Sequence, residues 1–125
     1  MTLWWPDFED VHDWLVDQGY PIRDWGLLNA ALERPLTTIA GVDAYPDIWF
    51  KTAAMLDSIE RSHPFIDGNK RVGYLLVALV LRGNSIDDST VSDDEWYDLI
   101  MTVASTHLEV PEIATRLRDL FSPID

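Results

Sequence analysis

The apolar residues of this chain recur at helical spacing along nearly its whole length, and strict alternation never extends beyond a few positions. Helices with one apolar face must bury that face against each other, which leaves a bundle as the natural architecture. The 125 residues suit one compact domain and leave no room for a second. We therefore expect an all-α fold, a single domain over residues 1–125 with about six helices.

Capping residues and helix breakers divide the chain into those helices. Asp and Ser favour the position before a helix, whereas Gly and Pro favour its end. The expected helices run from Asp7 to Gly19, from Asp24 to Pro35, from about Asp47 to Pro64, from the following loop to Gly83, from Ser92 onward, and from about Pro111.

Two segments depart from a simple amphipathic pattern. The helix that ends at Gly83 carries Leu75, Leu76 and Leu79 and is apolar on most sides, so we expect it at the centre of the bundle. The stretch 36–46 loses the helical period, and a short flap loop or small hairpin is expected there.

The charge balance is strongly acidic, with 22 Asp and Glu against nine Lys and Arg and a formal net charge of −13. Such a chain repels nucleic acid, so no nucleic-acid partner is expected. No apolar run reaches the roughly 18 residues of a membrane span, no leader pattern is visible, and there is no Cys, so we expect a cytoplasmic protein. The cations Arg61, Lys70, Arg71 and Arg82 cluster along the chain, which indicates a dedicated anion.

The segment from His63 to Arg71 has the composition of an anion-binding loop. Gly68 and Asn69 tolerate positive φ, and they precede a helix whose N-terminal N–H groups attract anions. Lys70 and Arg71 oppose the helix dipole at a cost of roughly 0.3–1 kcal/mol each, which a bound polyphosphate offsets.

The same segment offers the other groups of phosphoryl or nucleotidyl transfer. Asp67 is a hard oxygen ligand suited to Mg²⁺ beside phosphates, and a His side chain such as His63 can accept a proton from an attacking hydroxyl. Pro64 stiffens the turn, and Phe65 is expected to anchor it in the core. Taken singly, these residues describe an ordinary turn; only their joint occurrence is informative. The Gly-x-x-x-x-Gly-Lys-Ser/Thr phosphate loop is absent.

At these residues the chain resembles the Fic/Doc superfamily, whose signature His-Pro-Phe-x-Asp/Glu-Gly-Asn-Gly/Lys-Arg is matched at all nine positions. The segments 22–28, 31–35 and 45–47 resemble the death-on-curing (Doc) branch. The resemblance implies an α-bundle with a substrate-aligning flap at about 37–43. It further implies a general base at His63, a Mg²⁺ ligand at Asp67, and nucleotide-phosphate binding by Gly68, Asn69, Lys70 and Arg71.

The resemblance also bears on the reaction. Most Fic enzymes transfer a nucleoside monophosphate and carry Gly at the position of Lys70 and a second Arg at that of Tyr74. Both departures favour a Doc-like toxin that moves the γ-phosphate of ATP or another nucleotide to a target hydroxyl, such as a Thr of elongation factor Tu. A cognate antitoxin whose C-terminal segment folds on binding is implied as partner. A nucleotidyltransferase (AMPylation) and an inactive binding module of the same fold stay open as alternatives.

Other polar and aromatic residues are interpreted as structural. His12 and His107 lack partners at metal-ligand spacing. Asp87, Asp88, Asp93 and Asp94 lack the order of a calcium loop and are interpreted as a solvated turn. Four tryptophans are assigned to the core, the second of them also as a possible groove residue: Trp14, Trp25, Trp49 and Trp96.

Overall fold

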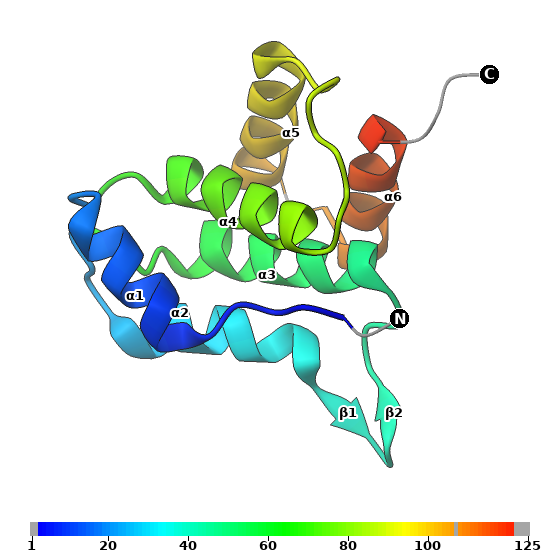
Figure 1. Cartoon of the computed structure of the whole chain (residues 1–125), viewed down its shortest axis with the longest axis horizontal. Helices are drawn as coiled ribbons and strands as arrows, with labels where there is room; N and C mark the ends of the chain where they lie inside the picture. The colour runs from blue at the N-terminus through cyan, green and yellow to red at the C-terminus, as the bar shows by residue number, and fades with distance from the viewer. Residues whose placement is uncertain (1–2, 107, 122–125) are drawn as a thin grey trace.

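The computed structural model describes residues 3–106 and 108–121, and these form the expected all-α bundle (Figure 1). Six α-helices, one short 3-10 helix and a two-stranded hairpin follow one another along the described chain. Their bounds are α1 Phe8–Asp17, α2 Trp25–Glu33, η1 Arg34–Leu36, β1 Thr38–Ile39, β2 Val42–Asp43, α3 Ile48–Ser62, α4 Asn69–Gly83, α5 Asp93–Ser105 and α6 Val110–Phe121.

The N-terminal caps expected from the sequence form as hydrogen bonds. The Asp7 carboxylate accepts two N–H groups of the first turn of α1, whereas Asp24 and Asp47 each accept one N–H group at the starts of α2 and α3. Ser92 and Glu95 complete a capping box at the start of α5. These helix starts are therefore decided by local chemistry.

The centre of the bundle is α3, whereas the apolar pattern favoured α4 for that place. In Figure 1, α3 runs through the middle of the fold, and it contacts α2, α4, α5 and α6. Nine of its 15 residues are buried, against seven of 15 in α4. The pattern misled because four buried positions of α3 are polar: Lys51, Thr52, Asp57 and Glu60.

The expected hairpin is present and is tied to α3 at its base. β1 and β2 pair antiparallel with Ile39 opposite Val42, and both strands are exposed. The buried Lys51 Nζ donates to the Asp43 carboxylate at 3.1 Å and to the Tyr45 carbonyl at 2.6 Å. These bonds anchor the base of the hairpin. Figure 1 shows the hairpin projecting from the bundle.

Some apolar residues of the helices are exposed. Val16 is 51% exposed, because α1 lies at the edge of the bundle and buries only Val11 and Leu15. Trp25 is 58% exposed and meets the ring of His12 edge-on at 4.3 Å, so its assignment to the core is wrong.

His107 lies outside the described residues. No helix in the described ranges is long and apolar enough to cross a membrane.

Candidate functional site

The segment between α3 and α4 reverses the chain through two residues in the left-handed region. His63 ends α3 with φ 51° and ψ 66°, and Gly68 precedes α4 with φ 85° and ψ 16°. The positive φ expected at Gly68 is confirmed. Asn69, the second expected position, is instead the first residue of α4, and His63 takes the left-handed conformation that side chains rarely adopt.

Gly68 is required by its surroundings as well as by its φ. A Cβ at this position would lie 3.0 Å from two ring carbons of Tyr20. The Tyr20 ring in turn meets the fully buried Phe65 edge-on at 6.3 Å between centroids. The expected anchoring of the loop by Phe65 is therefore confirmed, and the Tyr20–Phe65 pair packs the loop against the core.

The Arg23 side chain binds the backbone at the end of α3. Its Nε donates to the His63 carbonyl at 2.9 Å, and its Nη2 donates to the Ser62 carbonyl at 2.8 Å. The Pro64 carbonyl accepts the N–H groups of Arg23 and Asp24 at 2.8 and 3.0 Å. Arg23 thus stabilises the C-terminal end of α3 and fixes the backbone from which the His63 side chain extends.

The Asn69 side chain closes the loop on itself. Its Oδ1 accepts the Phe65 N–H at 3.0 Å, and its Nδ2 donates to the Phe65 carbonyl at 2.9 Å. Both polar atoms of the amide therefore bond to the backbone of Phe65, and Asn69 thereby fixes the shape of the loop.

The N-terminus of α4 is open. Gly68 provides no side-chain cap, and the first turn carries no acidic residue, only the exposed Lys70 and Arg71. The first N–H groups of a helix have no intrahelical acceptor, and here they lie beside two cations. This is the arrangement of an anion-binding helix start.

Asp67 lies directly before this helix start. It is exposed, and its Oδ1 accepts the Gly68 N–H at 2.8 Å. The described residues contain no group of three or more metal-ligating side chains. A single exposed carboxylate beside an anion site suits Mg²⁺, which binds through one or two carboxylates plus phosphates and waters.

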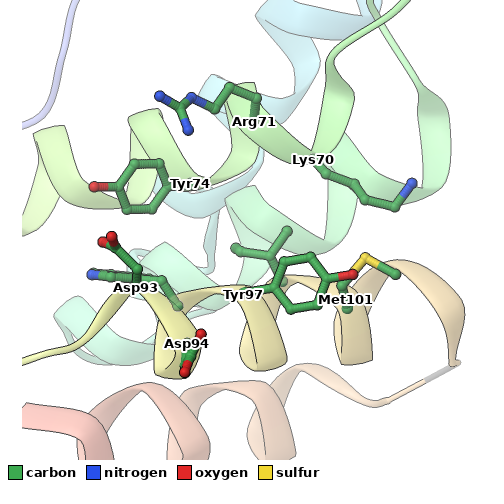
Figure 2. A pocket seen from close by; sticks show the side chains of 9 residues that line it. Lys70, Arg71, Tyr74, Asp93, Asp94, Tyr97 and Met101 are labelled. Atoms are coloured by element: carbon green, nitrogen blue, oxygen red, sulfur yellow. The ribbon is translucent and has the colours of Figure 1, made fainter.

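A pocket of about 560 Å³ lies between the starts of α4 and α5. Figure 2 shows the α4 cations on one side of it and α5 side chains on the other. His63 and Asp67 lie in the loop and do not line the pocket. The lining residues are Lys70, Arg71, Tyr74, Asp93, Asp94, Trp96, Tyr97, Ile100 and Met101.

Two features of this pocket differ from the sequence interpretation. Asp93 and Asp94 are exposed, as a solvated turn would require, but they are the first residues of α5 and they line the pocket. The positive cluster also divides: Arg61 pairs with Asp57 at 2.6 Å and Arg82 with Asp88 at 2.9 Å. Lys70 and Arg71 are the members of that cluster that line the pocket.

An aromatic pair supports Arg71. The Arg71 guanidinium lies 5.7 Å from the ring centroid of Tyr74, and that ring meets Trp96 edge-on at 5.1 Å. Figure 2 shows Arg71 and Lys70 diverging from α4, with Lys70 directed toward the side of Met101. The two cations therefore lie at different ends of the pocket.

A buried carboxyl on α3 lies close to the site, and nothing in the sequence pointed to it. Glu60 is 4% exposed, and its Oε2 has no hydrogen-bond partner among the described residues. Burial raises the pKa of Glu60 to about 8, against a smaller opposing effect of the Lys70 charge. A Glu in a helix normally indicates a solvated position, so only the packing reveals that Glu60, in the last turn of α3, is buried.

Comparisons with known proteins identify relatives of this chain. The family model described as Fic/DOC family matches residues 6–81, which include the loop and most of α4. A protein named Toxin Doc from Mycolicibacterium smegmatis is 41% identical over 97 residues, covering 77% of this chain and 75% of that protein. No solved structure matches.

Proposed function

The chain belongs to the Fic/DOC family, and on this basis we propose that it is the toxin of a toxin–antitoxin system and a protein phosphotransferase. It would transfer the γ-phosphate of a nucleotide to a Thr or Ser hydroxyl of a target such as elongation factor Tu, inhibiting translation. The observation that carries the proposal is the uncapped start of α4 with Lys70 and Arg71 at the edge of a pocket.

Phosphate binding follows from the open helix start. The helix fixes the first N–H groups of α4 before the ligand arrives, and such preorganised donors stabilise the charge of a transferring phosphoryl group. The exposed Lys70 and Arg71 add positive charge beside them. The remainder of ATP or another nucleotide fits the adjoining pocket, where Tyr97 and Met101 provide apolar surface.

The loop supplies the reacting groups. His63 accepts the proton of the attacking hydroxyl, and Arg23 keeps its backbone in place for that role. Asp67 would hold Mg²⁺, which supplies neutralisation of phosphate charge when it is bound. In this proposal the chain's own contribution is positioning and charge, which is what phosphoryl transfer mainly requires.

Two residues favour phosphotransfer over nucleotidyl transfer. Lys70 fills a position where many relatives of the wider superfamily have Gly, and its side chain extends along the pocket (Figure 2). Tyr74 stands where those proteins have a second Arg, and here it supports Arg71 instead of adding a charge. A phosphate chain bound in the pocket would therefore contact one Arg and one Lys, which lie at different ends of the pocket.

The proposed partners meet different parts of the surface. The exposed strands β1 and β2 offer backbone edges on which a segment of the target protein can align. A cognate antitoxin would silence the enzyme through a C-terminal segment that folds on it. We place these events in the cytoplasm, where translation takes place.

Labelled ATP tests the proposal. The purified chain is incubated with elongation factor Tu, Mg²⁺ and ATP labelled at either the γ or the α phosphate. Label on the target from the γ position alone is the expected result, and intact mass then shows an added phosphate. Label from the α position would show nucleotidyl transfer, and no label from either would remove elongation factor Tu as target.

Variants connect this chemistry to the toxin role. Expression of the chain should arrest growth, and His63→Ala or Asp67→Ala should abolish the arrest. Asp119→Ala removes an exposed carboxylate of α6, remote in sequence from the loop, and should arrest growth like the unaltered chain. Harmless expression of the unaltered chain would contradict the toxin assignment.

A further inference from the structure

Glu60 occupies a space that exists because residue 73 is a glycine. Gly73 faces α3 from the second turn of α4, and a Cβ there would collide with the Glu60 Oε2 and with a methyl group of Leu56. The carboxyl group therefore lies between α3 and α4 with its Oε2 buried and without a hydrogen-bond partner among the described residues. Its position is set by packing and not by a hydrogen bond.

Lys70 lies on the same side of α4 as Gly73, because residues three apart in a helix are neighbours on its surface. The Lys70 ammonium acts on Glu60 as an opposite charge without forming an ion pair with it. One cation of the pocket is thus within electrostatic reach of a buried carboxyl whose Oε2 has no hydrogen-bond partner among the described residues.

Other charges near Glu60 are already paired or face elsewhere. On α3 itself, Asp57 is bound by Arg61 and by Arg34 of η1 at 2.6 and 2.9 Å. The buried faces of α5 and α6 that pack on α3 are apolar. His63 follows one turn later, beyond the end of α3. Lys70 is accordingly the charge on which the ionisation of Glu60 acts most directly.

We propose that Glu60 sets the charge of the phosphate-binding site. As a neutral acid it leaves Lys70 to a bound phosphate, and as a carboxylate it competes with the phosphate for Lys70. The inference rests on the proposed nucleotide-binding function and deepens it. Glu60 touches neither nucleotide nor target, so it acts as a positioning residue through Lys70.

The sign of the effect follows from linkage. Glu60 is mostly neutral at pH 7 and ionises above about pH 8, so nucleotide affinity should fall as pH rises past that value. Conversely, a phosphate at Lys70 disfavours the carboxylate, so nucleotide binding near pH 8 should take up a proton. Free imidazole and terminal phosphate groups titrate below this window and do not produce such a fall.

Calorimetric titration with MgATP at pH 7, 8 and 9 tests the inference. The Kd of the unaltered chain should rise by at most about tenfold for each pH unit above 8, while Glu60→Gln should show little change. Glu112→Gln, an exposed Glu of α6, should keep the profile of the unaltered chain. Titrations at pH 8 in two buffers of different ionisation enthalpy should reveal proton uptake that Glu60→Gln abolishes.

The outcomes separate the two proposals. No MgATP binding at any pH would overturn the proposed function itself. Binding with equal pH dependence in the unaltered chain and in Glu60→Gln would leave the function standing and overturn the role of Glu60. If Glu60→Gln does not fold, proton uptake by the unaltered chain decides, and its absence at pH 8 rejects the inference.

Discussion

The helices α4 and α5 begin beside the same pocket but in opposite ways. At the start of α5, Ser92 accepts the Glu95 N–H and Glu95 accepts the Ser92 N–H, both at 3.1 Å. At the start of α4, Gly68 provides no cap, and the first turn carries two cations instead of acids. One helix start satisfies its own N–H groups, and the other leaves them available.

This difference distinguishes a structural helix start from one adapted to a ligand. Acids complement the positive end of a helix dipole, as Asp93 and Asp94 do on α5. Lys70 and Arg71 do the reverse, and an anion between them and the N–H groups would remove the conflict. The pocket therefore has a stable negative side on α5 and an unsatisfied positive side on α4.

Placing acidic residues in the first turn of α4, as in α5, should have the largest effect on MgATP affinity. In Lys70→Glu/Arg71→Glu, two charge-assisted contacts to phosphate are lost, so MgATP affinity should fall at least about a hundredfold. The free energy of unfolding should rise, since acids now complement the dipole by roughly 0.3–1 kcal/mol each. Calorimetry and urea denaturation measure the two effects. Arg116→Glu, an exposed residue of α6, should leave affinity unchanged.

Replacing Glu60 should stabilise the chain, because its carboxyl is buried against Gly73 of α4 and is costly to ionise there. The folded-state pKa of Glu60, about 8, exceeds the ordinary value of 4.5. Glu60 therefore does not lower the free energy of unfolding below pH 4.5, and it lowers it increasingly between pH 4.5 and pH 8. Glu60→Gln should raise the free energy of unfolding by up to about 3 kcal/mol at pH 7. Urea denaturation at pH 5 and 7 checks this: an equal gain at both pH values contradicts the assigned ionisation.

Helix starts such as those at Asp7, Asp47 and Ser92 could be predicted because each cap contacts residues at most three positions away. The loop was recognisable for the same reason: its groups are consecutive in sequence. The support that Arg23 gives to His63 bridges 40 positions, and no local pattern encodes it.

Burial of charge limited the prediction of the core and of the pocket. Lys51 and Asp57 are polar residues with partners on other elements, so a hydrophobic pattern assigned too little burial to α3. Asp93 was correctly placed at a helix start, yet its position opposite the α4 cations depends on how α4 and α5 pack. Such tertiary juxtapositions lie beyond single-sequence reasoning.

Gly68→Ala should test how strictly the open start requires glycine. The substitution adds a left-handed strain of roughly 1–2 kcal/mol and a contact with the Tyr20 ring, and it should lower both stability and MgATP affinity. Gly19 also has φ 85°, but a Cβ added there would meet no atom within 4 Å, so Gly19→Ala isolates the strain. Equal losses in the two variants would show that the Tyr20 contact costs nothing.

Removing the cap of α5 should have the smallest effect and the most local one. Ser92→Ala loses the acceptor for the Glu95 N–H, which should lower the free energy of unfolding by about 1 kcal/mol. Ser105→Ala, at the other end of the same helix, removes only a bond to the Met101 carbonyl and should be nearly neutral. MgATP affinity should stay within about twofold in both, because α5 contributes no phosphate-binding N–H group. A larger loss of affinity in Ser92→Ala would mean that the α5 start also binds the ligand, and the contrast with α4 would then have to be abandoned.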